Sequence, residues 1–269
     1  MELKPELGTP IALGRTAEIY AWQDNQVLKL FYDWFPLESI EYEAQIARSI
    51  SATGLPVPAV GDIIRINQRN GLLYERLNGE SMFAALIHRP WNVLRYGRHL
   101  AELQADMHAR SFQTGLPFQR QKIANKIHQA STLPPQLQAK SLSALEELPE
   151  DNRLCHGDFH PGNILVTPKG YRIIDWIDAS CGNPLADVAR TSILALGAAE
   201  TPQVKGALPK VWVRLFHHAY ISRYFQICPG GRDEYLRWLP VVAAARLSED
   251  IIELQPWLIA QVASRYAER

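Results

Sequence analysis

The segment 156–175 constrains the fold of this chain more than any other part of the sequence. It reads HGDFHPGNILVTPKGYRIID, and its glycines and first proline force a turn between Asp158 and Asn163. Two strand-like runs follow, joined by a turn at 167–170, and the second run leads into Asp175. Because paired strands lie about 5 Å apart, this hairpin is predicted to return Asp175 to the side of Asn163.

The oxygen-bearing side chains of this segment suit phosphoryl transfer with a magnesium ion. An asparagine amide and an aspartate carboxylate, here Asn163 and Asp175, are oxygen ligands that Mg²⁺ takes from a protein, with water and phosphates as its other ligands. Asp158 comes five residues before Asn163 and suits a group that orients or deprotonates an attacking hydroxyl. We therefore predict that Asp158, Asn163 and Asp175 are catalytic, the last two as metal ligands.

Two other kinds of site have to be weighed for a loop that contains two histidines. A zinc site would use Cys155, His156 and His160, but the first two are adjacent and no second Cys/His pair has a finger-like spacing. We expect His156 to brace the loop, and His160 either to lie near the phosphates or to be a turn residue. A serine hydrolase would need a nucleophile elbow such as G-x-S-x-G, which the chain does not contain.

The loop HGDFHPGN and the run IIDWIDASCGNPLADVAR together resemble the aminoglycoside phosphotransferase and choline kinase-like superfamily, relatives of the eukaryotic-type protein kinases. Protein kinases have H-R-D-x-x-x-x-N and D-F-G at these places, and both differences are typical of the small-molecule branch. The resemblance implies that Asp158 is the catalytic base and that Asn163 and Asp175 bind the metal. The G-x-P-x-x-D run at 182–187 is also common in this superfamily. The resemblance is specific only between residues 154 and 187.

The rest of the chain predicts the two lobes of a protein-kinase-like α+β fold. Short β-runs and one amphipathic helix at 38–50 indicate a small antiparallel lobe. The predicted β-runs are 11–13, 18–22, 26–31, 60–66 and 71–77. Long amphipathic helices follow, at about 91–110, 120–147, several after 184, 234–252 and 256–267. We predict a nucleotide-binding lobe at 1–78, a hinge near 75–79 and a mostly helical lobe at 79–269.

A lysine and a glutamate in the first lobe match what such a fold requires. Lys29 stands in the apolar strand VLKLF, where a half-buried cation needs a partner. Glu43 shares the inward face of the following helix with Ile40 and Ile50, so it is the expected partner. Lys29 would then also contact the α- and β-phosphates of a nucleotide.

Two further stretches are expected to bind the nucleotide. The turn GRTAE at 14–18 has a single glycine where a protein kinase has G-x-G-x-x-G, so backbone amides and the Thr16 hydroxyl would cover the phosphates. The run LLYERL at 72–77 has the position of a hinge strand, where the backbone of Glu75 and Leu77 would meet the purine. The predicted cofactors are ATP, or GTP, and Mg²⁺.

Composition argues against several classes of partner. The chain has 28 Lys and Arg against 28 Asp and Glu, so no overall charge favours nucleic acid or an anionic membrane. No signal-peptide pattern and no apolar run of about 18 residues is visible, and three widely spaced cysteines fit a reducing compartment. We expect a cytoplasmic protein, and its oligomeric state does not follow from the sequence.

The sequence does not determine the identity of the phosphate acceptor. Carboxylates of the C-terminal helices, at Glu249, Asp250 and Glu253, could hold a polycation such as an aminoglycoside, although these spacings are also those of a solvated helix face. Aromatic residues of the same region could form a cage for choline or another amino alcohol, or could fill the core. These aromatic residues are Trp212, Tyr220, Tyr224, Phe225, Tyr235 and Trp238.

Two readings without a small-molecule acceptor were also considered. A protein kinase needs an activation segment, and the chain runs quickly from IDW through 182–187 into a helix, which leaves little room for one. A nucleotide-binding pseudokinase would usually have lost Lys29, Asp158, Asn163 or Asp175, and all four are present. A small-molecule phosphotransferase is the function that the sequence favours.

Overall fold

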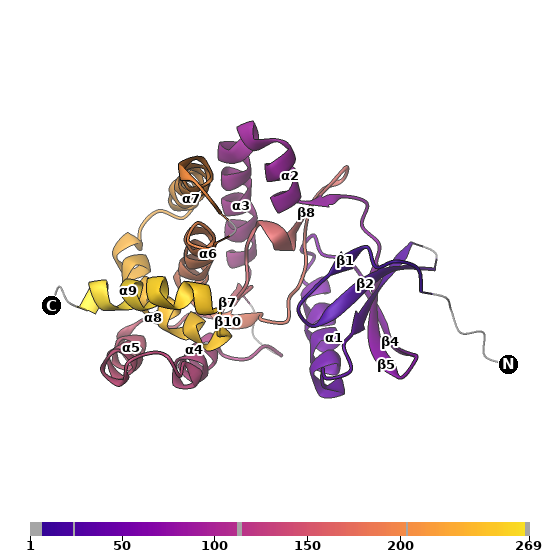
Figure 1. Cartoon of the computed structure of the whole chain (residues 1–269), viewed down its shortest axis with the longest axis horizontal. Coiled ribbons are helices and arrows are strands. Elements are labelled where there is room, and N and C mark those ends of the chain that lie inside the picture. The colour runs from indigo at the N-terminus through magenta and orange to yellow at the C-terminus, as the bar shows by residue number, and fades with distance from the viewer. Residues whose placement is uncertain (1–6, 24, 112–114, 203, 267–269) are drawn as a thin grey trace. The chain divides into compact units, whose positions relative to one another are not determined.

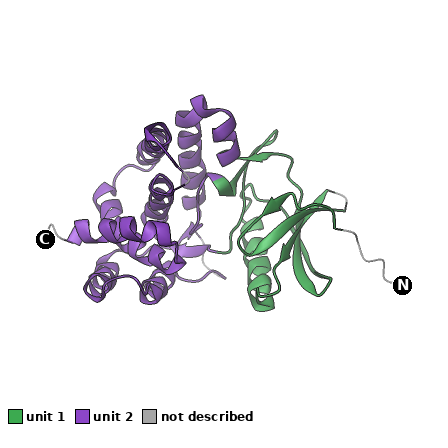
Figure 2. Ribbon diagram, viewed as in Figure 1, with its two compact units in different colours: residues 1–82, 162–177 green, residues 83–161, 178–269 purple. Residues whose placement is uncertain are grey.

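The computed structural model describes residues 7–23, 25–111, 115–202 and 204–266. The chain forms two compact units, shown in Figure 2. The first, which we call the β unit, comprises residues 1–82 and 162–177, and the second, the helical unit, comprises 83–161 and 178–269. The hairpin that follows the catalytic loop therefore has its contacts in the β unit. The division into lobes at 1–78 and 79–269 stays a prediction.

The β unit is built on an antiparallel sheet with strand order β1-β2-β3-β5-β4 (Figure 1). The elements of this part of the unit are β1 Ala12–Leu13, β2 Ala17–Trp22, β3 Gln26–Phe31, α1 Leu37–Ser51, β4 Val60–Ile66 and β5 Arg69–Glu75. Every strand predicted for this region is observed, with small shifts at the ends. Strands β2 and β3 pair as neighbours in sequence, as do β4 and β5. Strand β3 pairs on its other side with β5, after α1 and β4 have intervened in the sequence.

Strand alternation decides which way the residues of β3 face. Successive side chains of a strand point to opposite faces of its sheet. Leu28 and Leu30 belong to the apolar cluster on one face, whereas Phe31 packs with Ile40 of α1 on the other. Lys29 therefore lies on the face that α1 covers, which is where a partner on α1 can reach it.

A second small sheet in the β unit has the strand order β6-β8-β9. Its strands are β6 Glu80–Ser81, β8 Ile164–Thr167 and β9 Gly170–Ile173. The hairpin of β8 and β9 is the one that the sequence predicts between Asn163 and Asp175. Its register pairs Ile164 with Ile173, so the two ends of the hairpin are in line.

The helical unit consists of helices packed around two short paired strands, β7 and β10. Its elements are α2 Met82–His88, η1 Pro90–Asn92, α3 Val93–His108, α4 Gln119–Gln129, α5 Pro135–Glu147, β7 Arg153–Cys155, β10 Ser180–Gly182, α6 Pro184–Ala198, α7 Ala207–Ile227, α8 Arg232–Arg246, η3 Leu247–Glu249, η4 Ile252–Leu254 and α9 Gln255–Tyr266. Helix α3 packs along α7, and α8 contacts α6 and α9. At the α3–α7 contact a Cβ on Gly97 would lie 2.6 Å from the Phe216 carbonyl oxygen, so only glycine permits this approach.

Two long helices predicted from the sequence are wrong in their extent. The region 120–147 contains α4 and α5, separated by a break at 130–134, because Pro134 is extended and Pro135 begins a new helix. The region 234–252 is helical only to Arg246, after which two short 3₁₀ turns follow. Helix α2 was not predicted.

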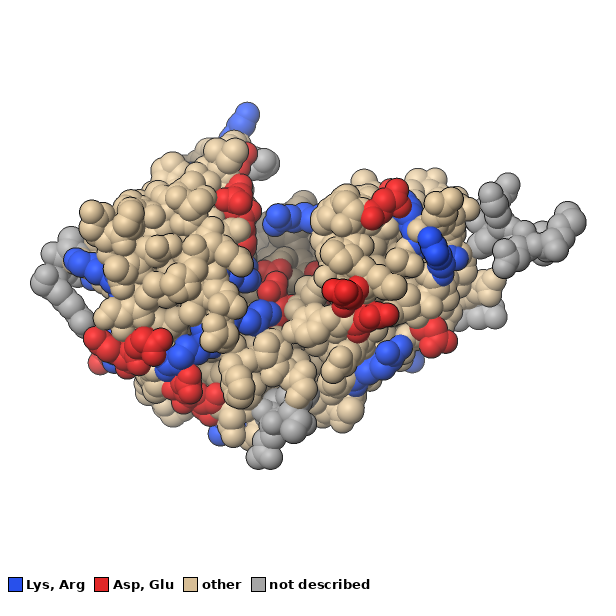
Figure 3. All heavy atoms as spheres, turned by 90° about the horizontal axis from the view of Figure 1, so that it is seen from below, with Lys and Arg blue, Asp and Glu red and all other residues tan. Residues whose placement is uncertain are grey.

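The surface carries charges of both signs. On the face shown in Figure 3, basic and acidic side chains are interspersed, and neither sign covers a continuous area. Among the described residues, no helix is both long and apolar enough to cross a membrane.

Candidate active site

In the β unit, the ammonium group of Lys29 lies between two carboxylates. Its Nζ is 2.7 Å from Oε1 of Glu43 on α1 and 3.4 Å from Oδ1 of Asp175. Glu43 is buried, and the same oxygen accepts a hydrogen bond from the Tyr74 hydroxyl at 2.8 Å. Burial alone would lower the pKa of Lys29, but the charges of Asp175 and Glu43 raise it above its ordinary value. The lysine therefore stays protonated.

The hairpin brings Asn163 and Asp175 together in the β unit, as the sequence predicts. Asn163 ends the 3₁₀ turn η2, Pro161–Asn163, and its carbonyl oxygen accepts the N–H of Ile174 at 3.0 Å. Asp175 has a left-handed backbone with φ of 64°, which is uncommon for residues other than glycine and often marks a functional site. Its carboxylate is 43 % exposed, so it can reach a ligand.

These two side chains fit a hard divalent cation that takes its remaining ligands from elsewhere. An amide oxygen and a carboxylate oxygen are suitable donors for Mg²⁺, which retains water and phosphate ligands. In the described part of the chain, no group of three or more His, Cys, Asp and Glu side chains is arranged to hold a metal. An ion at Asn163 and Asp175 would therefore depend on nucleotide phosphates for its affinity.

In the helical unit, Asp158 is held in its ionised form by two neighbours. Its Oδ1 is 3.4 Å from Nη2 of Arg190, and its Oδ2 is 3.4 Å from Nε2 of His160. Burial alone would raise the pKa of Asp158, but the hydrogen bond to His160 and the charge of Arg190 lower it well below its usual range. The carboxylate therefore stays ionised to a more acid pH than an ordinary aspartate.

Asp187 on α6 braces the loop that carries Asp158. Its carboxylate accepts the backbone N–H of His156 at 3.2 Å and of Gly157 at 2.7 Å. On its other side it contacts Nε2 of Gln104 at 2.9 Å and Nε2 of His108 at 3.2 Å. Burial alone would raise the pKa of Asp187, but the hydrogen bond and charge of His108 lower it. A fully buried anion therefore stabilises the loop through its backbone.

The loop itself depends on a glycine and a histidine. Gly157 has a positive φ of 79°, and a Cβ there would lie 2.4 Å from the Asp178 carbonyl oxygen, so no other residue fits. The buried ring of His156 accepts the N–H of Asp158 at 3.2 Å through Nδ1 and packs against Phe159. Through these contacts the His156 side chain braces the loop.

Asp158 also contacts an arginine whose ion pair with a glutamate the sequence analysis did not predict. The side chain of Arg190 on α6 is 12 % exposed, and its Nη2 lies 2.5 Å from Oε1 of Glu249 and 3.4 Å from Oδ1 of Asp158. Its Nε donates to the Gly157 carbonyl at 3.1 Å. An arginine three residues after Asp187 in an otherwise apolar helix could have been the signal, because a buried guanidinium needs carboxylate partners.

This ion pair involves one of the carboxylates named for a polycationic acceptor. Glu249 is the partner of Arg190 and lies 4.0 Å from Nη1 of Arg246. Asp250 and Glu253 are exposed.

The aromatic cage considered for a quaternary ammonium group is not formed by the residues named for it. Five of the six are buried in the core of the helical unit, and these are Tyr220, Tyr224, Phe225, Tyr235 and Trp238. Trp212 is partly exposed. The core packing that was the alternative for these residues is therefore what the structure shows.

The remaining predicted nucleotide-binding residues lie in the β unit. Thr16 immediately precedes β2, and its carbonyl oxygen accepts the N–H of Tyr32 at 3.0 Å. Glu75 is the last residue of β5, and its N–H donates to the Ala59 carbonyl at 2.8 Å. Leu77 follows β5 and is partly buried.

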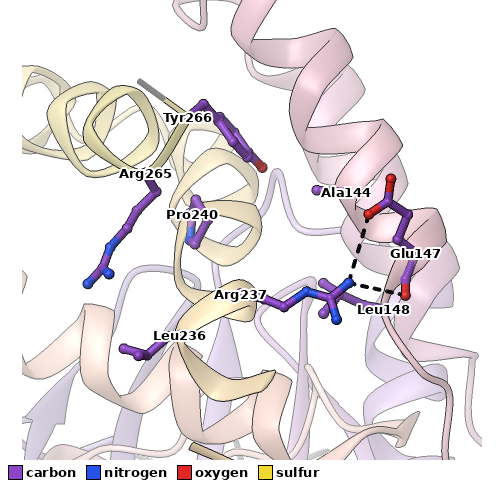
Figure 4. Close-up of a pocket in the computed structure, with 8 residues that line it drawn as sticks. All are labelled: Ala144, Glu147, Leu148, Leu236, Arg237, Pro240, Arg265 and Tyr266. Atoms are coloured by element: carbon purple, nitrogen blue, oxygen red, sulfur yellow. Dashed lines mark hydrogen bonds and ion pairs between the residues drawn. The ribbon is translucent and has the colours of Figure 1, made fainter. Parts of the chain in front are cut away.

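A separate cavity of about 230 Å³ lies within the helical unit between α5, α8 and α9 (Figure 4). Arg237 faces Glu147 there, with Nη2 3.4 Å from its carbonyl oxygen and 3.9 Å from its carboxylate. The lining contains none of the predicted site residues.

Comparison with solved structures identifies relatives of the same fold. Aminoglycoside phosphotransferase APH(4)-Ia, solved with AMP-PNP and hygromycin B, is 17 % identical with a TM-score of 0.65, over 97 % of this chain and 92 % of that chain. Amicoumacin kinase hAmiN, solved with AMP-PNP, Ca²⁺ and Ami, is 15 % identical with a TM-score of 0.65, over 97 % and 89 %. Choline kinase from Cryptosporidium parvum Iowa II is 13 % identical with a TM-score of 0.61, over 97 % and 88 %. The predicted kinase-like α+β fold is confirmed.

The sequence itself also matches a family. No curated protein matches the chain in a sequence comparison. The model of the phosphotransferase enzyme family, however, matches residues 8–220, which include every residue predicted for the site. The chain therefore belongs to the phosphotransferase enzyme family, as its catalytic loop and IDW segment indicated.

Proposed function

We propose that this protein transfers the γ-phosphoryl group of ATP, or of GTP, to a hydroxyl group of a small molecule. The observation that carries the proposal is the position of Lys29 between Glu43 and Asp175. A strand lysine paired with a helix glutamate, next to an aspartate that can bind the metal, is the arrangement that holds nucleotide phosphates in kinases. Membership of the phosphotransferase family supports the same reaction.

The residues of the site would divide the work as follows. Lys29 binds the α- and β-phosphates, and Glu43 keeps its ammonium group in place. Asn163 and Asp175 would hold Mg²⁺, which neutralises charge on the phosphates during transfer. Asp158 accepts a hydrogen bond from the acceptor hydroxyl and directs its oxygen at the phosphorus. Since phosphoryl transfer needs little covalent help from a protein, positioning and charge are the main contributions.

The proposed purine contacts follow from the backbone at the end of β5. The N–H of Glu75 is already donated to Ala59, so a contact with a purine at Glu75 would use its carbonyl oxygen. The N–H of Leu77 would supply the matching donor. Adenine and guanine would use different hydrogen-bonding groups of the purine for these contacts. The Thr16 hydroxyl would contact the phosphates.

A small molecule is the preferred acceptor for two reasons. Only residues 176–183 separate Asp175 from α6, which leaves no length for the activation segment of a protein kinase. In addition, the relatives of known structure were solved with small molecules such as hygromycin B and Ami. We expect the enzyme to work in the cytoplasm, where ATP is available.

The proposal is tested by measuring nucleoside diphosphate release with Mg·ATP and Mg·GTP, alone and with hydroxylated acceptors of different charge. We expect slow basal hydrolysis that depends on Asp158 and is stimulated by one class of acceptor. Nucleotide binding without any turnover would instead support a pseudokinase. A protein that neither binds a nucleotide nor hydrolyses it would rule the proposal out.

The pH dependence of the reaction should reveal how Asp158 acts. Because the folded protein holds the pKa of Asp158 below its ordinary value of 3.8, its ionised form persists down to more acid pH. We expect no loss of kcat/KM from this group above about pH 4, which steady-state kinetics from pH 4 to 9 would show. An acid limb near pH 6 that moves when Arg190 is replaced by methionine would mean that the carboxylate titrates there.

Replacing Lys29 with methionine should weaken nucleotide binding. We expect Kd for Mg·AMP-PNP to rise about 10- to 100-fold, since charged hydrogen bonds contribute about 1.5–3 kcal/mol. Calorimetric titration with Mg·AMP-PNP measures this directly. The exposed Lys169, in the turn between β8 and β9, offers a matched control, and Lys169→Met should bind like the unmodified protein. Unchanged affinity in Lys29→Met would remove the lysine from the phosphate site.

A further inference from the structure

Two lysines of the helical unit share one carboxylate beside the catalytic loop. On α4, Nζ of Lys122 and Nζ of Lys126 lie 3.3 Å and 3.2 Å from the same oxygen, Oδ1 of Asp178. Lys122 also donates to the carbonyl oxygen of Asp178 at 2.8 Å. Each ammonium group has three N–H donors, so both have donors left for a ligand or for water. Among these three side chains, two positive charges face one carboxylate.

This lysine pair, Lys122 and Lys126, lies next to the residues that hold Asp158. The carbonyl oxygen of Asp178 is so close to Gly157 that a Cβ there would be 2.4 Å away, and Gly157 directly precedes Asp158. A cavity of about 50 Å³ is lined by both lysines, Asp178, Asp187, Gly157 and Arg190, among others. The carboxylate of Asp187 already accepts the backbone N–H groups of His156 and Gly157. Since one water needs roughly 10–15 Å³, the cavity has room for a few waters or for one oxyanion.

Most of the groups considered for a cationic acceptor are engaged elsewhere. Glu249 forms an ion pair with Arg190, and most of the aromatic residues considered for a cage are in the core. Around the lysine pair, burial lowers the pKa of Lys122, because the single carboxylate of Asp178 only partly compensates for its desolvation. A second anion would complete this cluster.

We infer that the acceptor of this enzyme carries an anionic group, a phosphate or a carboxylate, which binds Lys122 and Lys126 while its hydroxyl faces Asp158. The inference rests on the proposed function, because it concerns the acceptor of that reaction. The anion would replace water in the cavity and would use the N–H donors that Asp178 leaves. It thereby fixes the distance between the charged end of the acceptor and the hydroxyl that is phosphorylated.

The test compares acceptors in matched pairs that differ only in charge. Glucose 6-phosphate is paired with glucose, and glycerate with glycerol, while choline and kanamycin represent cations. Binding is measured by calorimetry on protein saturated with Mg·AMP-PNP, so no turnover is needed. We expect the anionic member of at least one pair to bind 10- to 100-fold more tightly than its neutral partner. The pair that shows the preference distinguishes a phosphate from a carboxylate.

Substitutions of the lysines connect that preference to this cavity. In Lys126→Met the preference for the anion should fall about 10-fold while affinity for the neutral partner is kept, and Lys126→Glu should abolish the preference. Lys122→Met gives an independent second variant, and Lys169→Met serves as the control. Loss of affinity for both members of a pair alike would indicate that the lysines only brace Asp178, and would overturn the inference.

The outcomes separate this inference from the proposed function. Tighter binding of cations, equal binding of charged and neutral partners, or no binding of any acceptor would refute an anionic acceptor. The proposed function would still stand if basal Mg·ATP hydrolysis is present and is lost in Asp158→Asn. If hydrolysis and nucleotide binding are both absent, the proposed function fails, whatever the acceptors do.

Discussion

Replacing Asp158 with asparagine is expected to lower kcat by about 10²- to 10⁴-fold and to leave nucleotide affinity unchanged. Asparagine keeps the size of the side chain but loses the negative charge that orients the acceptor hydroxyl. The carboxylate of Asp158 lies close to Arg190 and His160 in the helical unit, whereas the proposed phosphate ligand Lys29 is in the β unit. Single-turnover kinetics together with calorimetric titration of Mg·AMP-PNP would measure both quantities.

The same substitution at Asp175 is expected to have the opposite pattern, a loss of nucleotide affinity. Asp175→Asn should weaken the Mg·nucleotide complex at least about 10-fold, because it removes a charged ligand from the ion that the phosphates share. Asp62→Asn, an exposed aspartate of β4, should behave like the unmodified protein. Equal loss of nucleotide affinity in Asp158→Asn and Asp175→Asn would contradict the division of roles between base and metal ligand.

Replacing Asp187 with alanine should have the largest effect on stability. The side chain is fully buried and is the acceptor for the backbone N–H groups of His156 and Gly157 and for the side chains of Gln104 and His108. Removing one member of a buried charged network costs about 3–5 kcal/mol, because its partners lose their acceptor without gaining water. Urea unfolding monitored by tryptophan fluorescence would show the midpoint moving to lower denaturant.

Two variants show whether this loss comes from the network. Asp187→Asn retains one acceptor oxygen and should cost clearly less than the alanine variant. Asp62→Ala removes an exposed carboxylate and should change the free energy of unfolding by less than about 0.5 kcal/mol. An alanine variant at 187 that is as stable as Asp62→Ala would mean that the loop is held by other contacts.

The parts of the structure that the sequence predicts correctly depend on short-range patterns. Strand alternation around Lys29 and helical periodicity around Glu43 each assign a face, and the two faces meet because α1 packs on the sheet. The hairpin between Asn163 and Asp175 is equally local, since one turn determines its register. The charge of Lys29 then limits its possible partners to acidic residues, because a half-buried lysine requires a carboxylate.

The parts that were missed depend on contacts between distant segments. Arg190 on α6 indicates that a carboxylate partner is needed, but its local pattern does not identify Glu249, on another element, as that partner. Burial of Tyr220 and Trp238 follows from how α7 and α8 pack in the helical unit, so helical spacing alone could not separate a cage from a core. Pro134 and Pro135 indicate the break between α4 and α5, but the helical periodicity of the residues on both sides led to the prediction of one continuous helix.

The hairpin 162–177 belongs to the β unit, and this affects the order in which the chain can fold during its synthesis. Neither compact unit is one continuous stretch, since residues 83–161 are synthesised before the β unit receives its last segment. Until then the β unit lacks Asp175 as a neighbour of Lys29, and Pro56 lacks the N–H of Ile173. The β unit therefore cannot be completed in strict N- to C-terminal order. A gene fragment that ends at residue 82 would encode an incomplete module, and exchange of units between relatives would have to transfer both pieces together.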